Sequence, residues 1–195
     1  QDLYPRALAD VNGDGKADIV GFGEAGTYVA LATGGGNLAA PIMPLQGFGF
    51  SNAGGGWTTQ DLYPRELADV NGDGKADIVG FGDAGVYIAL ATGDGAFGQT
   101  QFAIADLGYD SGWRVDRHPR FLADLRNRGR KDIVGFGNAG VFVALSNGDG
   151  TFAYTPAPVL PYFCYDQGWR MDRHVRYVID LRGNEGGGSA MTESL

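Results

Sequence analysis

The sequence predicts an all-β fold, a β-propeller of four-stranded antiparallel blades, on three observations. Tryptophan recurs at Trp57, Trp113 and Trp169, so the repeat is about 56 residues long. Glycine makes up 34 of 195 residues, far above the usual ~7% and without the three-residue period of collagen. Short runs of β-branched and aromatic residues lie between the glycines, as in strands joined by tight turns. A repeat of this length suits one four-stranded blade.

The second repeat contains all four strands expected in a blade. The predicted strands are residues 63–70 (YPRELADV), 76–82 (ADIVGFG), 85–92 (GVYIALAT) and 98–108 (GQTQFAIADLG), and the last of these is the outer edge. Residues 109–118 then cross to the next blade. The first repeat follows the same plan from Tyr4 and the third from His118.

The chain is expected to hold three blades plus one extra first strand. The repeats divide it into about 1–57, 58–113, 114–169 and a partial unit at 170–183. Residues 184–195 are Gly-rich and lack periodicity, which is typical of a disordered tail. Propellers close with four to eight blades. We therefore expect the ring to be closed by oligomerisation, as a homodimer with six or seven blades.

Two acidic loops, at residues 10–23 and 69–82, share the sequence DVNGDGKADIVGFG. Oxygen-bearing side chains at the first, third, fifth and ninth positions, with glycine at the sixth, suit Ca²⁺. The expected ligands are Asp10, Asn12, Asp14, the carbonyl of Lys16 and Asp18, and likewise Asp69, Asn71, Asp73, the carbonyl of Lys75 and Asp77. Glycine replaces the glutamate that an EF-hand has at the twelfth position, and a strand follows. The alternative is an Asx-type turn without metal.

The third loop, DLRNRGRKDIVGFG from Asp124, has lost this pattern. Arg126 and Arg128 stand where asparagine and aspartate stand in the other two loops. We expect a guanidinium to pair with Asp124 and Asp132 in place of an ion. The fourth loop, from Asp180, lacks a ninth-position acid and is also expected to bind no metal.

The crossing segments combine an aromatic ring with polar side chains, as a sugar site requires. The candidates are Trp57, then Trp113 with Arg114, Asp116 and His118, and then Trp169 with Arg170, Asp172 and His174. In an extended segment, Arg114, Asp116 and His118 would point to one side together. The alternative is structural, with the tryptophan plugging the space between blades and the polar groups forming a buried tie. Asn138, Glu24 and Asp83 are weaker candidates, while Tyr28, Tyr87 and Phe142 are expected in the core.

Several functional classes are disfavoured. A net charge of −8 argues against a nucleic-acid groove, which needs a basic face. The two histidines occupy equivalent repeat positions, and no nucleophile elbow, zinc motif or phosphate loop is present, so we do not expect an enzyme. The single cysteine, Cys164, excludes an internal disulfide and is expected to be buried. No apolar run has membrane-spanning length.

Two stretches resemble known repeats. The pattern DxNxDGxxD followed by IVGFG resembles the FG-GAP repeat of integrin α-chain propellers. Residues 112–152, GWRVDRHPRFLADLRNRGRKDIVGFGNAGVFVALSNGDGTF, closely resemble the repeat of the family of the Psathyrella velutina lectin. That resemblance extends from residue 1 to about residue 183. The sequence departs from it in length, and in carrying Tyr4 and Tyr63 where later repeats have histidine.

The lectin resemblance implies a seven-bladed propeller with Ca²⁺ in some loops and sugar sites between neighbouring blades. It implies a preference for N-acetylglucosamine with some tolerance of sialic acid, and it favours a secreted protein or one that acts outside the cell. The integrin resemblance implies an alternative, a Ca²⁺-dependent module that binds protein and no sugar.

Overall fold

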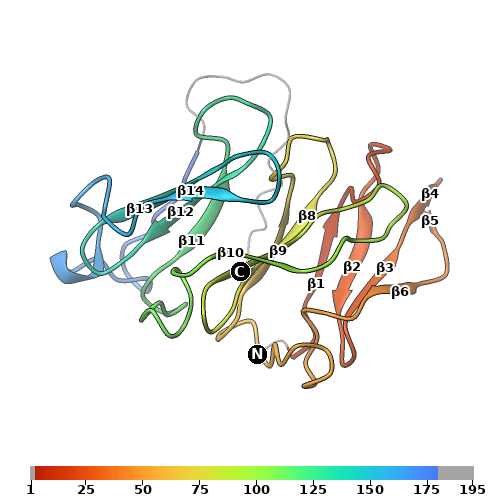
Figure 1. Ribbon diagram of the computed structural model, residues 1–195, viewed down its shortest axis with the longest axis horizontal. Helices are drawn as coiled ribbons and strands as arrows, with labels where there is room; N and C mark the ends of the chain where they lie inside the picture. Colours follow the sequence, from red (N-terminus) through yellow and green to blue (C-terminus); the bar gives the residue numbers. More distant parts are fainter. Residues whose placement is uncertain (1–2, 180–195) are drawn as a thin grey trace.

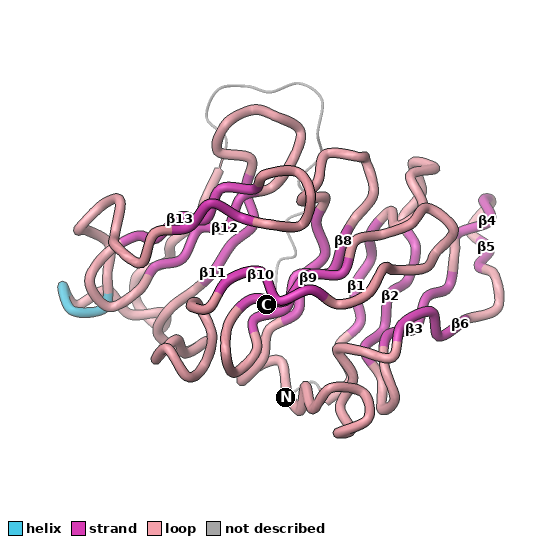
Figure 2. Tube along the Cα trace, viewed as in Figure 1, coloured by secondary structure: helices cyan, strands magenta, loops and turns pink. Residues whose placement is uncertain are grey.

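The structure is a computed structural model, and it describes residues 3–179. Three four-stranded antiparallel sheets follow one another along the chain and stand in a row along the long axis of the molecule (Figure 1). Loops and tight turns separate the strands, and one short 3₁₀ helix, η1 (Tyr165–Gln167), lies at one end of the row (Figure 2). The all-β prediction is therefore confirmed. No helix among the described residues is long and apolar enough to span a membrane.

Each sheet uses four consecutive predicted strands. The first contains β1 (Arg6–Ala9), β2 (Asp18–Phe22), β3 (Thr27–Ala30) and β6 (Ile42–Leu45), in that order. The second contains β7 (Arg65–Ala68), β8 (Asp77–Phe81), β9 (Val86–Ala89) and β10 (Gln101–Ile104). The third contains β11 (Arg120–Ala123), β12 (Asp132–Phe136), β13 (Val141–Ser146) and β14 (Phe152–Tyr154). The fourth strand of each sheet lies at an edge, as expected.

One hairpin was not predicted. Strands β4 (Ala32–Gly34) and β5 (Asn37–Leu38) form a small two-stranded sheet in the first repeat. Three successive glycines with positive φ, Gly34, Gly35 and Gly36, make its turn. Only glycine adopts this conformation at no steric cost.

The register repeats from sheet to sheet. In each sheet the arginine that opens the first strand pairs with the glycine of the second strand, as Arg6↔Gly21, Arg65↔Gly80 and Arg120↔Gly135. A one-residue slip would turn every side chain to the opposite face. The common register therefore places equivalent residues of the three repeats on equivalent faces.

The hydrophobic core lies between the sheets. We call the face that each sheet turns toward the next sheet its leading face, and the opposite one its trailing face. The leading face of the first sheet, including Val20 and Phe22, packs on Ile78 of the second sheet. The leading face of the second, including Val79 and Phe81, packs on Ile133 of the third. Burial of each such side chain contributes roughly 1.5–3 kcal/mol, so each sheet depends on its neighbour for stability.

Tryptophan and glycine interlock at each of the two inner junctions. A Cβ atom on Gly80 would lie 2.5 Å from the indole of Trp57, and one on Gly135 would lie 2.7 Å from the indole of Trp113. No real Cβ contact is that short, so the Gly-Phe-Gly motif is required by the ring that lies on it. Both tryptophans are buried, with exposed fractions of 8% and 7%.

A strained residue and an arginine also recur at each junction. Phe48, Leu107 and Phe163 all have positive φ, between 57° and 64°. Their carbonyls accept hydrogen bonds from the next arginine in the repeat, namely Arg65, Arg120 and Arg176, at 2.9, 2.8 and 3.1 Å. Left-handed backbone is costly for such residues. In every repeat the residue with positive φ is also the one whose carbonyl accepts the arginine hydrogen bond.

The extra strand expected at 170–183 does not form within the described residues. Residues 174–179 are irregular, because no second strand lies beside them in the described part of the chain and a strand needs a partner for its backbone hydrogen bonds. Residues 180–183, the loop from Asp180 and the expected tail at 184–195 lie outside the described residues. The expected repeat boundaries near 57, 113 and 169 fall in the connections between sheets or after the last strand.

Candidate functional site

A pocket of about 240 Å³ lies at the junction of the second and third sheets. It brings together the predicted residues Trp113 and His118 with the weaker candidate Asn138, from the β12–β13 turn. Phe142, which we expected to be a core residue, also lines it. The remaining lining residues are Asp106, Ser111, Gly112, Gly137, Ala139 and Pro156.

His118 is a buried, neutral imidazole that orients Asn138. Its Nδ1 accepts the backbone N–H of Arg114 at 3.1 Å. The proton therefore sits on Nε2, which lies 2.8 Å from Oδ1 of Asn138 and donates to it. Burial lowers the pKa of His118 below its ordinary value, although the Asn138 hydrogen bond opposes this shift. With Oδ1 engaged, Asn138 keeps its amide NH₂ for a ligand.

Asp106 holds the indole of Trp113. Its carboxylate accepts hydrogen bonds from Trp113 Nε1 at 3.2 Å, from the Leu107 backbone N–H at 2.6 Å and from the Tyr154 hydroxyl at 2.6 Å. Sequence reasoning missed this residue because the equivalent positions are Gly47 and Tyr162, so no repeat pattern marks it.

Arg114 and Asp116 do not line the pocket. The expected extended segment is wrong, because the backbone N–H groups of Arg117 and His118 both donate to the Arg114 carbonyl, at 3.2 and 2.7 Å, and wind it into a turn. Arg114 Nη1 donates to the Tyr109 carbonyl at 2.7 Å, and its guanidinium stacks 3.5 Å from the centre of that ring. Asp116 is exposed beside Arg117.

The junction at Trp57 has different chemistry. Tyr63 stands in the place of His118, and Asp83 in the place of Asn138. Burial, with a hydrogen bond to Asp83, raises the pKa of Tyr63 to about 12. The first repeat has the same kind of pair, because the Tyr4 hydroxyl donates to Glu24 at 2.7 Å. Within the described residues, His118 and Asn138 are thus the pair without a carboxylate.

The segment at Trp169 repeats the local geometry without a facing sheet. The Arg170 backbone N–H donates to His174 Nδ1 at 3.1 Å, and Arg170 Nη1 donates to the Tyr165 carbonyl at 2.6 Å. Asp172 is exposed beside Arg173. Trp169 is only half-buried and His174 is exposed. The local cluster therefore forms without a second sheet opposite it in the described part of the chain.

The two acidic loops are wound as Asx-type turns. The Asp10 carboxylate accepts the backbone N–H groups of Gly13 and Gly15, each at 2.7 Å. The Asp69 carboxylate accepts those of Gly72 and Gly74, at 2.6 and 2.8 Å. Lys16 and Lys75 pair with the fifth-position acids Asp14 and Asp73, while Asn12 and Asn71 each accept the backbone N–H two residues on.

The ninth-position aspartates are fully buried in all three loops. Asp18 accepts two backbone N–H groups, from Val11 and Ala32, and Asp77 does the same with Val70 and Ala91. Burial raises the pKa of Asp77 to about 7, although these hydrogen bonds oppose the shift.

In the third loop, Arg126 places its guanidinium 2.7 Å from Asp132. The predicted pairing of Arg126 with Asp132 is thus present. Arg128 differs, because it reaches Asp124 through its backbone N–H and not through its side chain.

The loops carry oxygen donors of the kind that Ca²⁺ prefers, but these donors do not converge on one point in the structure. Within residues 3–179, no group of three or more histidine, cysteine, aspartate or glutamate side chains is placed to hold a metal. The carboxylates turn toward N–H groups of their own loop. Each oxygen of Asp18 and Asp77 accepts one such bond and keeps a second lone pair.

Among solved structures, this chain is similar to a lectin of Agrocybe aegerita, described as specifically recognising non-reducing terminal N-acetylglucosamine. The identity is 48% over 92% of this chain, with a TM-score of 0.86. This chain spans only 44% of that lectin. The similarity shows a lectin-like fold.

More distant structures share the fold alone. TcdB2-TccC3 matches 70% of this chain at 21% identity with a TM-score of 0.54, and the match covers 6% of its own chain. The Tc holotoxin pore of Photorhabdus luminescens matches 80% of this chain at 21% identity with a TM-score of 0.56, over 7% of its own chain. No protein-family model matches the sequence, and no curated protein matches it.

Proposed function

We propose that this chain is a multivalent lectin that binds terminal N-acetylglucosamine between neighbouring blades of a β-propeller. The observation that carries the proposal is its 48% identity, over 92% of its length, with a lectin described as recognising that sugar. Because this chain spans 44% of that lectin, its activity is inferred from the shared repeats. The neighbour is a lectin and not an enzyme, in keeping with a chain whose sequence carries no catalytic motif.

The pocket beside Trp113 offers the chemistry that an acetamido sugar needs. Sugars are bound by an apolar surface plus a few fixed donors and acceptors. Phe142 supplies the apolar surface, on which the acetamido methyl packs. The Asn138 NH₂, held outward by His118, donates to a hydroxyl or carbonyl oxygen, and Asp106 and Ser111 accept from hydroxyls. Trp113 acts through its packing and its bond to Asp106 more than as a stacking platform, because its exposed fraction is 7%.

A neutral sugar suits this pocket better than an acidic one. Asp106 adds a negative charge to the lining, and a like charge at short range disfavours a ligand carboxylate. We therefore propose N-acetylglucosamine as the preferred ligand and sialic acid as a weaker one, to be compared in the same titration.

We also propose that Ca²⁺ stabilises the loops that begin at Asp10 and Asp69. The support comes from the third loop, where Arg126 supplies positive charge to the buried Asp132. Asp18 and Asp77 are equally buried and have asparagine at the position of Arg126. A buried carboxylate without a counter-charge is costly, and a divalent cation held by the loop oxygens would supply one. The ion's part is structural, since these loops do not line the pocket.

We propose a homodimer that completes a six- or seven-bladed ring. Three sheets in a row leave one outer face at each end, and apolar faces of soluble proteins are normally covered. Ring closure by a second copy needs no further chain.

Calorimetric titration of the chain with N-acetylglucosamine, and with its 4-epimer N-acetylgalactosamine, tests the lectin proposal. We expect binding of the first sugar and a loss of at least tenfold in affinity in Asn138→Asp, which removes the NH₂ donor with little change of shape. The matched control is Asp83→Asn at the Trp57 junction, which should leave the affinity of the Trp113 pocket unchanged. A folded chain with no sugar binding, or an unaffected Asn138→Asp, would refute the proposal.

A further inference from the structure

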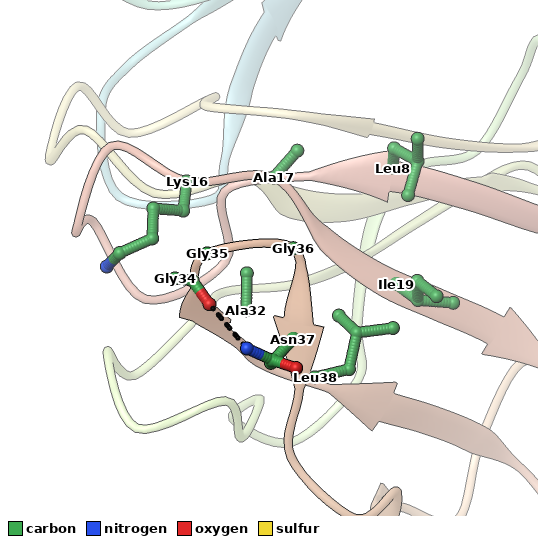
Figure 3. A pocket seen from close by; sticks show the side chains of 10 residues that line it. All are labelled: Leu8, Lys16, Ala17, Ile19, Ala32, Gly34, Gly35, Gly36, Asn37 and Leu38. Carbon is green, nitrogen blue, oxygen red and sulfur yellow. Dashed lines mark hydrogen bonds between the residues drawn. The ribbon is translucent and has the colours of Figure 1, made fainter.

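The two ends of the row of sheets carry complementary surfaces. At one end, the trailing face of the first sheet presents Leu8, Ala17, Ile19 and Ala32 around an open pocket of about 390 Å³ (Figure 3). Leu8 is 66% exposed. The residues equivalent to Ile19 in the next two repeats, Ile78 and Ile133, are both 0% exposed, because the leading face of the preceding sheet covers them.

At the other end, the third sheet has a leading face with no sheet on it in the described chain. Its apolar residues Val134, Phe136 and Val141 form a small buried cluster that packs against Phe121, Leu125 and Val178 of the same chain. Trp169 follows the third sheet in the chain and lies at the same end of the row. It contacts Phe163 and His174 and is half-buried, whereas its equivalents Trp57 and Trp113 are buried against the glycines of the following sheet.

We propose that a second copy of this chain covers each of these ends, with Trp169 of one copy lying on Gly21 and Gly23 of the partner subunit. The inner junctions show the geometry twice, with Trp57 on Gly80 and Gly82 and Trp113 on Gly135 and Gly137. Gly21 is the same repeat position, and a Cβ there would meet only Arg6, at 3.6 Å. The glycine therefore leaves room for an indole that the same chain does not supply.

In this arrangement residues 174–179 of one copy replace the first strand of the partner's first sheet. Residues 174–179 and residues 4–9 are the same part of the repeat, so only one of them can lie beside β2 of the partner. Arg176 already binds the Phe163 carbonyl at 3.1 Å and is 7% exposed, whereas Arg6 is exposed. The sequence Arg-Tyr-Val-Ile also favours a strand more than Arg-Ala-Leu-Ala does. Residues 174–179 of one copy thus take the place of β1 in the partner.

This exchange builds a further sugar pocket from two chains, an extension that rests on the proposed lectin function. His174 replaces Tyr4 of the partner subunit and faces the partner's Glu24, as His118 faces Asn138. Trp169 and the partner's Tyr28 stand where Trp113 and Phe142 stand. Because Glu24 is an acceptor only, this composite pocket lacks the NH₂ donor that Asn138 supplies. It should therefore bind the sugar more weakly than the Trp113 pocket does, and it should exclude acidic sugars more strongly.

Gly21→Ala tests the association directly, because within the chain the added methyl group would meet only the Arg6 side chain, at an ordinary contact distance of 3.6 Å. Light scattering of the 195-residue chain should give twice its 20.6 kDa mass. Gly21→Ala and Trp169→Ala should each give folded monomers. The matched control is Gly80→Ala, whose methyl group would meet Trp57 at 2.5 Å within the chain; it should melt at a lower temperature and remain dimeric.

Mixing the two monomeric variants gives the sharpest result. Gly21→Ala keeps a normal Trp169 end and Trp169→Ala keeps a normal Gly21 end, so the mixture should form a dimer with one intact interface. A monomeric wild-type chain, a dimeric Gly21→Ala or a mixture that stays monomeric would each overturn the association.

Sugar titration of the same samples separates the two proposals. Gly21→Ala should lose the weaker sugar site of each chain and keep the stronger one at Trp113. A dimer that binds no sugar would refute the lectin function and the composite pocket but not the association. A monomeric wild-type chain that binds sugar would refute the association alone.

Discussion

The protonation state of His118 decides which hydrogen bonds it makes to Arg114 and Asn138, and so how the Asn138 side chain is oriented in the candidate pocket. As a neutral ring it accepts from the Arg114 backbone with Nδ1 and donates to Asn138 with Nε2. A protonated ring would donate from both nitrogens, so the Arg114 N–H would face a second donor. Burial lowers the pKa of His118 from its ordinary 6.5, and the folded pocket therefore favours the neutral form.

The pH dependence follows with a definite sign. Because the folded pKa lies below the unfolded one, the unfolded chain binds the proton more readily. His118 thus contributes stability that is full above about pH 6.5 and is lost as the pH falls through the lowered folded pKa. We expect sugar affinity and melting temperature to fall together on acidification below this point.

The control for this prediction is His118→Gln, because Asp77 and other carboxylates also titrate. The melting temperature of the wild type should fall relative to that of the variant on acidification. Parallel curves for the two proteins from pH 8 to pH 5 would show that His118 does not titrate in this way.

At the scale of single elements, the loop before the second strand of each sheet contains a buried aspartate whose charge needs a counter-charge, and the three loops differ in what supplies it. Asp18, Asp77 and Asp132 are fully buried. Asp18 and Asp77 each accept one backbone N–H from their loop and one from beyond the third strand, whereas Asp132 accepts the Ser146 N–H and the Arg126 guanidinium. Arg126 provides the counter-charge in the third loop. The first two loops carry asparagine there, which leaves the negative charge for a cation to offset.

Calcium removal tests this difference. At an ion concentration of 100 times Kd, one site adds about 2.7 kcal/mol, which for a domain of this size is roughly 5–10 °C of melting temperature. Excess chelator should therefore lower the melting temperature of the chain.

Replacing Asn12 and Asn71 together by arginine should copy the third loop, keep the chain folded and abolish the effect of chelator. A wild-type melting curve that chelator leaves unchanged would show that the loops hold without metal.

The elements also show what sequence could and could not predict. Strands were predictable because their alternating apolar residues and glycines repeat three times, and the predicted strands of the second repeat all form. The turn at 114–118 was missed because two local backbone hydrogen bonds to the Arg114 carbonyl outweigh the alternating polar pattern. Asp106 was missed because it occurs in one repeat alone. The contact of Trp57 with Gly80 could be predicted only in part. The sequence shows that tryptophan and glycine both recur, but it does not show that they meet between two sheets.

For the whole molecule, the junction of the second and third sheets contains both the buried Trp113 and the candidate pocket. Trp57 and Trp113 each lie buried between two sheets, and the crossing segment that carries Trp113 also forms one wall of the pocket. The facing wall comes from the next sheet, through Asn138 and Phe142 at the Trp113 junction. The pocket beside Trp113 therefore needs residues of two neighbouring sheets. At Trp169 the local cluster forms, but no sheet of the described residues lies opposite it to supply a second wall.

The central claim is that N-acetylglucosamine binds between the second and third sheets, and a crystal structure of the chain with this sugar tests it most directly. We expect the sugar in the Trp113 pocket, with its acetamido methyl on Phe142 and a hydrogen bond from the Asn138 NH₂. Sugar bound elsewhere on the molecule, with the Trp113 pocket filled only by water, would contradict the claim.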